Sequence, residues 1–204
     1  MTEGKTTTSY ALLGLLSVRE WTTYELAKQV QRSLNWFWPR AERKLYDEPK
    51  RLVEQGLATA TQEHTGQRAR TVYRITSQGR RALRDWLGEP PAPRSCEFEG
   101  MVKVFFADAG SREQLLATLD CIEAEAMQRM AELAEMATAR PLVFPQRVHV
   151  NALALRLQRD QEEAVLRWVR WAREQVGQWS STEDPGAWDP IAVLDDLASS
   201  SREP

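Results

Sequence analysis

A proline-rich break divides this chain and limits the fold that either side can adopt. Residues 88–94 read Gly-Glu-Pro-Pro-Ala-Pro-Arg, with three prolines and one glycine in seven positions. Because proline ends a helix and stiffens an extended linker, we expect no helix to cross this segment. A length of 204 residues is enough for two small domains. We therefore predict domains at residues 1–88 and 96–178, followed by a tail at 179–204 that is partly ordered or flexible.

The two halves of the chain differ in charge. Residues 1–90 hold fifteen Lys and Arg against ten Asp and Glu, whereas residues 91–204 hold twelve against nineteen. From His64 to Arg84 there are six arginines and no acidic residue. A basic module before an acidic one favours a polyanion-binding N-terminal domain and a different task for the C-terminal part.

The pattern before the break predicts three helices, a two-stranded hairpin and a fourth helix. This is the order of a winged helix-turn-helix, so we expect a mainly α fold. Ser9 and Thr23 are the expected N-caps of the first two helices. The predicted helices cover residues 9–18, 23–34, 39–55 and 76–87, and the predicted strands cover residues 57–61 and 70–75.

The third helix has one packing face and one cationic face. On a helical wheel, Pro49 and Leu52 lie within about 40° of Leu45, and long polar side chains that can reach phosphates and guanine edges lie opposite. A solvated surface helix would show the same pattern. The arginine-rich wing favours the DNA-binding interpretation, because the wing would lie along the neighbouring DNA backbone or minor groove. For the tyrosine, packing with its hydroxyl outward is the alternative to a phosphate contact. The residues predicted to contact DNA are Arg40, Arg43, Lys44, Tyr46, Asp47, Lys50 and Arg51 in the helix, and Arg68 and Arg70 in the wing.

The second half predicts two long amphipathic helices. Ser111 and Gln114 form a capping box, and the apolar stripe that follows runs for about 27 residues. A helix of about 40 Å cannot be covered by the core of a small domain. We therefore expect an antiparallel hairpin that pairs with a second copy in a two-fold dimer, which would let two recognition helices read a palindrome about 34 Å apart. The predicted dimer contacts are Leu115, Leu119, Ile122, Met130, Leu133, Leu157 and Trp168.

Several segments resemble the PadR family of bacterial transcriptional regulators. They are SYALLGLL at 9–16, KLYDEPKRLVEQGLA at 44–58, VYRITSQGRRAL at 72–83 and FEGMVKVFFADAGSREQLLATL at 98–119. The resemblance implies a winged helix-turn-helix followed by C-terminal helices that are exchanged between protomers. Pro49 departs from the family, which more usually has leucine there. A proline at this position is expected either to tilt the part of the helix from Arg40 to Asp47 into the groove or to end the straight part of the helix early. The tail after Val176 has no counterpart in the family.

We expect a small aromatic or amphipathic effector, as resemblance to effector-responsive PadR members implies. Trp168 and Trp171 on the last helix, and Trp36 and Trp38 before the recognition helix, are the candidate stacking surfaces. Local core or interface packing is the alternative for all four. An effector bound between the domains would change the spacing of the recognition helices, so we predict a repressor that an effector releases from DNA.

Other functional classes find no support in the sequence. The sequence contains no Gly-rich phosphate loop, no metal-ligand spacing and no nucleophile elbow. We expect carboxylate pairs such as Glu162-Glu163 to be exposed on their helix. We therefore predict that the protein is not an enzyme and uses no cofactor or metal. The longest apolar run, residues 10–18, is about half as long as a membrane helix, and we expect a cytoplasmic protein with no membrane contact. The alternative function is a winged-helix adaptor that binds other proteins without sequence-specific DNA binding.

Overall fold

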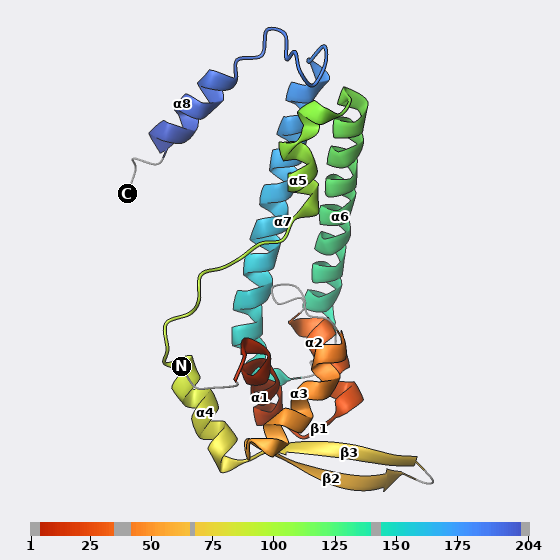
Figure 1. Cartoon of the computed structure of the whole chain (residues 1–204), viewed down its shortest axis with the longest axis vertical. Coiled ribbons are helices and arrows are strands. Elements are labelled where there is room, and N and C mark those ends of the chain that lie inside the picture. Colours follow the sequence, from red (N-terminus) through yellow and green to blue (C-terminus); the bar gives the residue numbers. More distant parts are fainter. Residues whose placement is uncertain (1–4, 35–41, 66–67, 140–143, 201–204) are drawn as a thin grey trace. The chain divides into compact units, whose positions relative to one another are not determined.

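The structure, a computed structural model, is mainly helical and contains one small antiparallel sheet, which confirms the predicted fold class. The chain divides into two compact units, residues 1–94 and 95–204 (Figure 1). Within the part that the structure describes, no helix is both long and apolar enough to cross a bilayer. The structure describes residues 5–34, 42–65, 68–139 and 144–200.

The first unit packs its helices over the sheet around a core of leucines. Helix α1 contacts α3, α4 and β3, and α2 contacts α3. Tyr10 of α1 stacks on Trp86 of α4, with ring centroids 4.7 Å apart. The elements of this unit are α1 (Thr7–Val18), β1 (Trp21–Thr22), α2 (Thr23–Ser33), α3 (Glu42–Glu54), β2 (Ala58–Thr65), β3 (Arg68–Ile75) and α4 (Ser77–Leu87).

Two of the predicted helix starts are displaced because a threonine just upstream takes the capping role. Thr6, and not Ser9, is the N-cap of α1, and the two side chains form a capping box. Thr22, and not Thr23, is the N-cap of α2, where Glu25 completes the box. A capping box satisfies two backbone N–H groups at once, so it outcompetes a single cap one residue later in α2 and three residues later in α1.

The sheet has three strands in the order β1-β3-β2. The wing hairpin pairs β2 with β3 along its whole length, from Ala58 opposite Ile75 to Thr65 opposite Arg68, so both strands are longer than predicted. The third strand was not predicted, because Trp21 and Thr22 are too few to give a period of two. They pair with Tyr73 and Val72, and Trp21 is buried.

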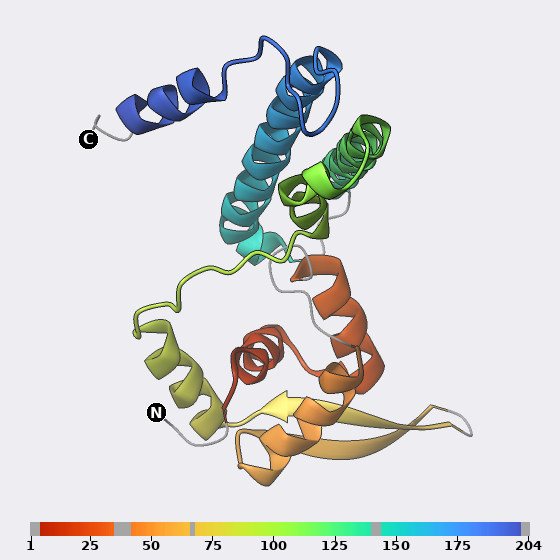
Figure 2. The same ribbon diagram turned by 45° about the horizontal axis from the view of Figure 1, so that its top comes forward.

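The second unit is a helical hairpin with shorter segments attached to it (Figures 1 and 2). The predicted capping box at Ser111 and Gln114 opens the first long helix. The two long helices pack against each other, and α5 packs on α6. The elements are α5 (Glu99–Phe105), the 3-10 turn η1 (Ala107–Ala109), α6 (Arg112–Thr138), the 3-10 turn η2 (Pro145–Arg147), α7 (Val148–Gly177) and α8 (Pro190–Ser200).

One end of this hairpin is held by arginines that cross between its helices. Arg112 at the start of α6 donates to the carbonyl oxygens of Val176 and Gly177, at 2.9 and 2.6 Å, which satisfies the open C-terminal end of α7. Arg173 of α7 binds Glu123 and Asp120 of α6, at 2.5 Å each. Hydrogen bonds from Arg173 and then Arg170 hold the pKa of Glu123 below its usual value.

Glu162 is buried in the hairpin, so its predicted exposure is wrong. Its carboxylate accepts a hydrogen bond from Arg129 of α6 at 2.6 Å. Gln158, one turn earlier on α7, is also buried. Since an isolated carboxylate could not remain inside the hairpin, the arginine from the facing helix makes this burial possible and ties the register of α6 to that of α7.

Candidate functional site

Helix α3 turns its predicted packing face into the core. Leu45 and Leu52 are buried, and Pro49 is as fully buried as they are. The helix continues past the proline to Glu54. Packing accounts for this, because the proline ring lies within the buried face that helps to hold the helix in place.

The outward side of α3 presents part of the predicted DNA-contacting set. Asp47 and Lys50 are exposed, the Arg51 side chain is 64% exposed, and Tyr46 is half-buried. These side chains come from one helix whose opposite face is fixed in the core, so they form a continuous polar surface. Arg40 lies outside the described residues, as do the side chains of Arg43, Lys44 and Arg68.

A buried carboxylate in the same helix was missed by the sequence reasoning. Glu48 is only 7% exposed and accepts a short hydrogen bond from the hydroxyl of the fully buried Ser9 on α1. Its second oxygen lies 3.9 Å from the Arg51 guanidinium. The pair therefore links the inner face of α3 to α1 and places a negative charge beside one of the predicted DNA-contacting arginines.

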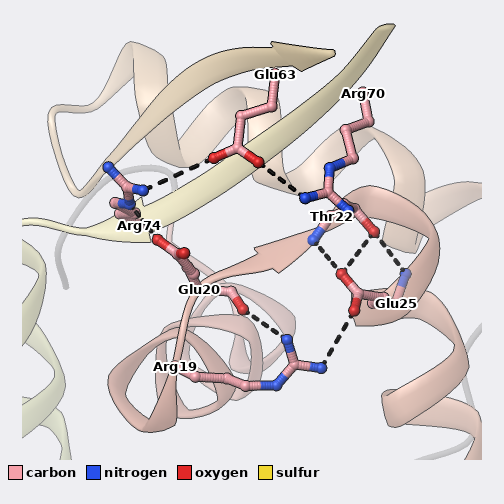
Figure 3. Close-up of polar contacts among 7 residues, drawn as sticks. All are labelled: Arg19, Glu20, Thr22, Glu25, Glu63, Arg70 and Arg74. Carbon is pink, nitrogen blue, oxygen red and sulfur yellow. Dashed lines mark hydrogen bonds and ion pairs between the residues drawn. The ribbon is translucent and has the colours of Figure 1, made fainter. Parts of the chain in front are cut away.

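The wing carries its own carboxylate partner for the predicted arginine (Figure 3). Arg70 of β3 donates to Glu63 of β2 at 2.9 Å, and Arg74 lies 3.8 Å from the other oxygen of Glu63. Arg74 also makes a short hydrogen bond to Glu20, which is the main reason why the pKa of Glu20 is lowered. Glu63 stands just outside the run of arginines and Glu20 lies far from it in the sequence, so a count of charges within that run does not reveal these pairs.

A second cluster in Figure 3 fixes the start of α2 beside the wing. The Arg19 guanidinium lies 3.5 Å from the centroid of the Trp21 ring and binds Glu25 at 3.3 Å. Burial raises the pKa of Glu25, but the combined hydrogen bonds from Thr22 and Arg19 outweigh it and the pKa falls. This cluster ties the α1–β1 corner to the capping box of α2, so the helix that precedes α3 begins at a fixed point.

The described DNA candidates therefore differ in how free their charge is. Arg51 and Arg70 each face a carboxylate, whereas Lys50 makes no ion pair with any residue that the structure describes. The Arg70–Glu63 pair is partly exposed and contributes little to stability, so a phosphate can replace Glu63 at small cost. Glu48 keeps its hydrogen bond from Ser9, so the exposed Arg51, whose guanidinium lies 3.9 Å from Glu48, can turn toward a phosphate. Lys50 needs no such exchange.

Most of the predicted dimer contacts on α6 are buried inside the single chain. Leu115, Leu119, Ile122 and Leu133 are each at most 5% exposed. The first three pack with Val169, Ala172 and Val176 of α7 in one cluster. The inference that this stripe needs a second chain is therefore wrong, because the other helix of the hairpin covers it. Met130 and Trp168 are half-buried, and Leu157 is exposed.

Helix α7 is apolar on two sides, and only one of them faces α6. The predicted stripe centred on Trp168 includes Leu157 and Trp171, which are 55% and 40% exposed. Val150 and Leu153 extend the same surface and are 41% and 73% exposed. A row of exposed apolar side chains along a long helix is a candidate protein–protein surface.

Of the four predicted effector tryptophans, the structure describes Trp168 and Trp171. Trp168 packs against the α6–α7 cluster, Trp171 is partly exposed, and Trp36 and Trp38 lie outside the described residues. A groove of about 370 Å³ lies between α5 and α6 and is lined by residues that include Phe98, Gly100 and Cys121, without a tryptophan. Among the described side chains, no group of three or more His, Cys, Asp or Glu is placed to hold a metal ion.

Comparison with known proteins matches each unit to a family model. Residues 12–85 match the transcriptional regulator PadR-like family, and residues 99–176 match the C-terminal domain of the virulence activator alpha family. Among curated proteins, the chain is 27% identical over 170 residues to the negative transcriptional regulator PadR of Bacillus subtilis, covering 78% of this chain and 92% of that protein.

Solved structures of the same Bacillus subtilis protein share the fold. Its complex with operator DNA has a TM-score of 0.69 at 25% identity and covers 81% of this chain and 97% of that one. Its complex with p-coumaric acid has a TM-score of 0.67 at 24% identity and covers 84% and 99%. The matched relatives are transcriptional regulators and not enzymes. Residues 12–85 therefore belong to the PadR-like family of transcriptional regulators, and residues 99–176 follow as a C-terminal domain of the virulence activator alpha family.

Proposed function

We propose that this regulator acts as a homodimeric repressor that binds a palindromic operator. The observation that carries the proposal is the outward polar face of α3, where Lys50 and Arg51 are exposed while Leu45 and Leu52 hold the opposite face in the core. The relative from Bacillus subtilis, named a negative regulator, is known in complex with operator DNA. We assign DNA binding to residues 1–88 and dimerisation to residues 96–178.

In this proposal α3 enters the major groove and the β2–β3 wing follows the adjacent backbone or minor groove. Phosphates displace Glu63 from Arg70 and draw Arg51 away from Glu48, since both pairs involve exposed guanidinium groups. The major-groove set is Arg40, Arg43, Lys44, Tyr46, Asp47, Lys50 and Arg51, and the wing set is Arg68 and Arg70.

The dimer is proposed to form through the exposed apolar face of α7. Leu157 and Trp171 on this face are 55% and 40% exposed, and Met130 and Trp168 are half-buried. Burying such side chains against a second copy is favourable at about 25 cal/mol per Å² of apolar surface. A two-fold axis would then hold the two α3 helices at the spacing of one DNA turn.

The salt dependence of operator binding tests this function. The full chain is titrated into duplex DNA from the region next to its own gene, at several salt concentrations, by fluorescence anisotropy. About six phosphate contacts per dimer predict a log–log slope of affinity against salt concentration of about −5, with much weaker binding to a scrambled duplex. Weak binding that does not distinguish the two duplexes would instead support the protein–protein adaptor.

We further propose that a hydroxycinnamic acid such as p-coumaric acid weakens operator binding, as the complex of the relative suggests. Binding to the C-terminal unit near Trp168 and Trp171 would quench their fluorescence and lower operator affinity about tenfold or more, because an effector releases DNA only as far as it prefers the unbound geometry. Tryptophan emission and operator anisotropy are followed in one titration. Quenching without any loss of operator affinity would contradict the proposal.

A further inference from the structure

The C-terminal tail is an addition to the matched family domains, and its first part is folded against the hairpin. The family match ends at Val176, which leaves residues 177–204 outside it. Trp179 packs on the α6–α7 cluster, and Trp188 lies against it with ring centroids 5.2 Å apart. Thr182 donates to the Gly110 carbonyl oxygen at 2.7 Å. This segment, residues 179–188, anchors the tail at the C-terminal end of α7.

Helix α8 follows this anchor and has an apolar face that its own chain leaves exposed. Asp189 caps the helix by accepting hydrogen bonds from the backbone N–H groups of Ile191 and Ala192, at 2.9 and 3.2 Å. Ile191, Leu194 and Leu197 recur on one side of the helix and are 60%, 58% and 62% exposed. An isolated helix of 11 residues is marginal in water, so this face needs a partner surface.

A surface that fits this helix is the N-terminal half of α7. Its Leu153 and Leu157 are 73% and 55% exposed. Residues 147–155 contain Arg147 and His149 without an acidic residue, and Arg156 and Arg159 bind Asp160 and Glu163 on the next turn of the same helix. Residues 189–200 contain three aspartates without a basic residue. The two segments are therefore complementary both in their apolar side chains and in charge.

Distance places this surface beyond the reach of α8 within one chain. Leu153 lies 24 residues before the end of α7, which at 1.5 Å per residue is about 36 Å from the anchor. Helix α8 spans only about 16 Å. In a two-fold dimer that pairs the α7 faces antiparallel, however, the N-terminal half of one α7 lies beside the C-terminal end of the other.

We propose that α8 is an arm that packs on the N-terminal half of α7 of a second copy, with Ile191, Leu194 and Leu197 against Leu153. The arm adds an intersubunit contact that the family domains lack. This inference rests on the proposed dimer and specifies one contact within it.

Cross-linking between two differently tagged full-length chains tests the arm. Both chains carry Cys96→Ser and Cys121→Ser, which remove the two exposed native cysteines. One chain also carries Leu194→Cys and the other Leu153→Cys, and the co-expressed pair is treated with a short bismaleimide. We expect a covalent heterodimer that carries both tags. Ala192→Cys, on the opposite side of α8, is the matched control and should cross-link about tenfold less.

Two further measurements separate the arm from the dimer itself. Truncation after Asp189 keeps the anchor and removes α8. It should raise the dimer Kd about tenfold or more, as measured by sedimentation equilibrium. Leu194→Asp should have the same effect, whereas Ala192→Asp, on the opposite side of α8, should not. Two outcomes would overturn the arm but not the dimer. One is a stable dimer that forms no heterodimer cross-link, and the other is a cross-link within one chain that carries both Leu194→Cys and Trp171→Cys. A monomeric full-length chain would overturn the dimer and the arm together.

Discussion

Substitution Gly79→Ala is expected to cost the N-terminal unit about 3 kcal/mol or more of its free energy of unfolding. A Cβ atom on residue 79 would lie 2.1 Å from the carbonyl oxygen of Leu57 and 2.9 Å from Cγ1 of Ile75. The oxygen belongs to the backbone, so no change of rotamer can move it away. The start of α4 would have to shift by more than an ångström to relieve the overlap.

Three hydrogen bonds of Thr76 resist that shift. Its backbone N–H donates to the same Leu57 oxygen at 3.0 Å. Its hydroxyl donates to the Gly56 carbonyl oxygen at 2.7 Å and accepts from the Gly79 N–H at 3.0 Å. Moving α4 would break these bonds and would disturb the turn at Gly56, whose φ of +70° already favours glycine.

Urea unfolding of the full chain, with hydrogen exchange of the α4 amides to locate the effect, checks this prediction. Gly14→Ala in α1 is the matched control, because its Cβ would meet nothing within 4 Å. Helix propensity predicts that this control gains about 0.5–1 kcal/mol. Equal stability of the two variants would show that α4 does not dock on Leu57 as described.

The sequence predicted most elements because their signals are local. The periodicity of α3 and the capping box of α6 each lie within a few turns of chain, and both are present in the structure. The Thr22–Glu25 capping box is the same kind of local signal, and it shows that the expected cap at Thr23 is wrong by one residue. Strand β1 had no local signal, since Trp21 and Thr22 join the sheet only by pairing with residues fifty positions away.

The prediction that the apolar stripe of α6 contacts a second chain is wrong. A wheel shows that α6 is amphipathic but not which helix covers it, and Leu119 is covered by α7 of its own chain. On α7 the stripe with the larger side chains, including Leu157, faces outward, while Glu162 faces inward because Arg129 neutralises it. Only the three-dimensional pairing could assign these faces.

Charge counts showed the same limit at the DNA site. They identified the basic wing but not the pairing of Arg70 with Glu63, because the acidic partner lies on the neighbouring strand, outside the run of arginines. Nor did they separate Arg51, which lies near the buried Glu48, from Lys50. The structure therefore ranks the predicted cations by how much of their charge is already balanced, and Lys50 ranks first among those it describes.

This ranking predicts that Lys50→Glu lowers operator affinity about 100-fold or more at moderate salt, since each dimer loses two phosphate contacts and gains two repulsive charges. The magnitude of the salt slope should also fall by about 2. Lys50 is exposed and makes no ion pair with a described residue, so the substitution should change the free energy of unfolding by no more than about 0.5 kcal/mol.

Lys103→Glu on α5 is the matched control, because this lysine is also exposed and the same charge is reversed in the other unit of the chain. Anisotropy titrations of both variants on the same operator duplex make the comparison. If the two variants lost affinity equally, net charge would explain operator binding and α3 would not be the recognition helix. A large loss for Lys50→Glu alone, with the dimer intact in sedimentation, would place the operator on the outward face of α3.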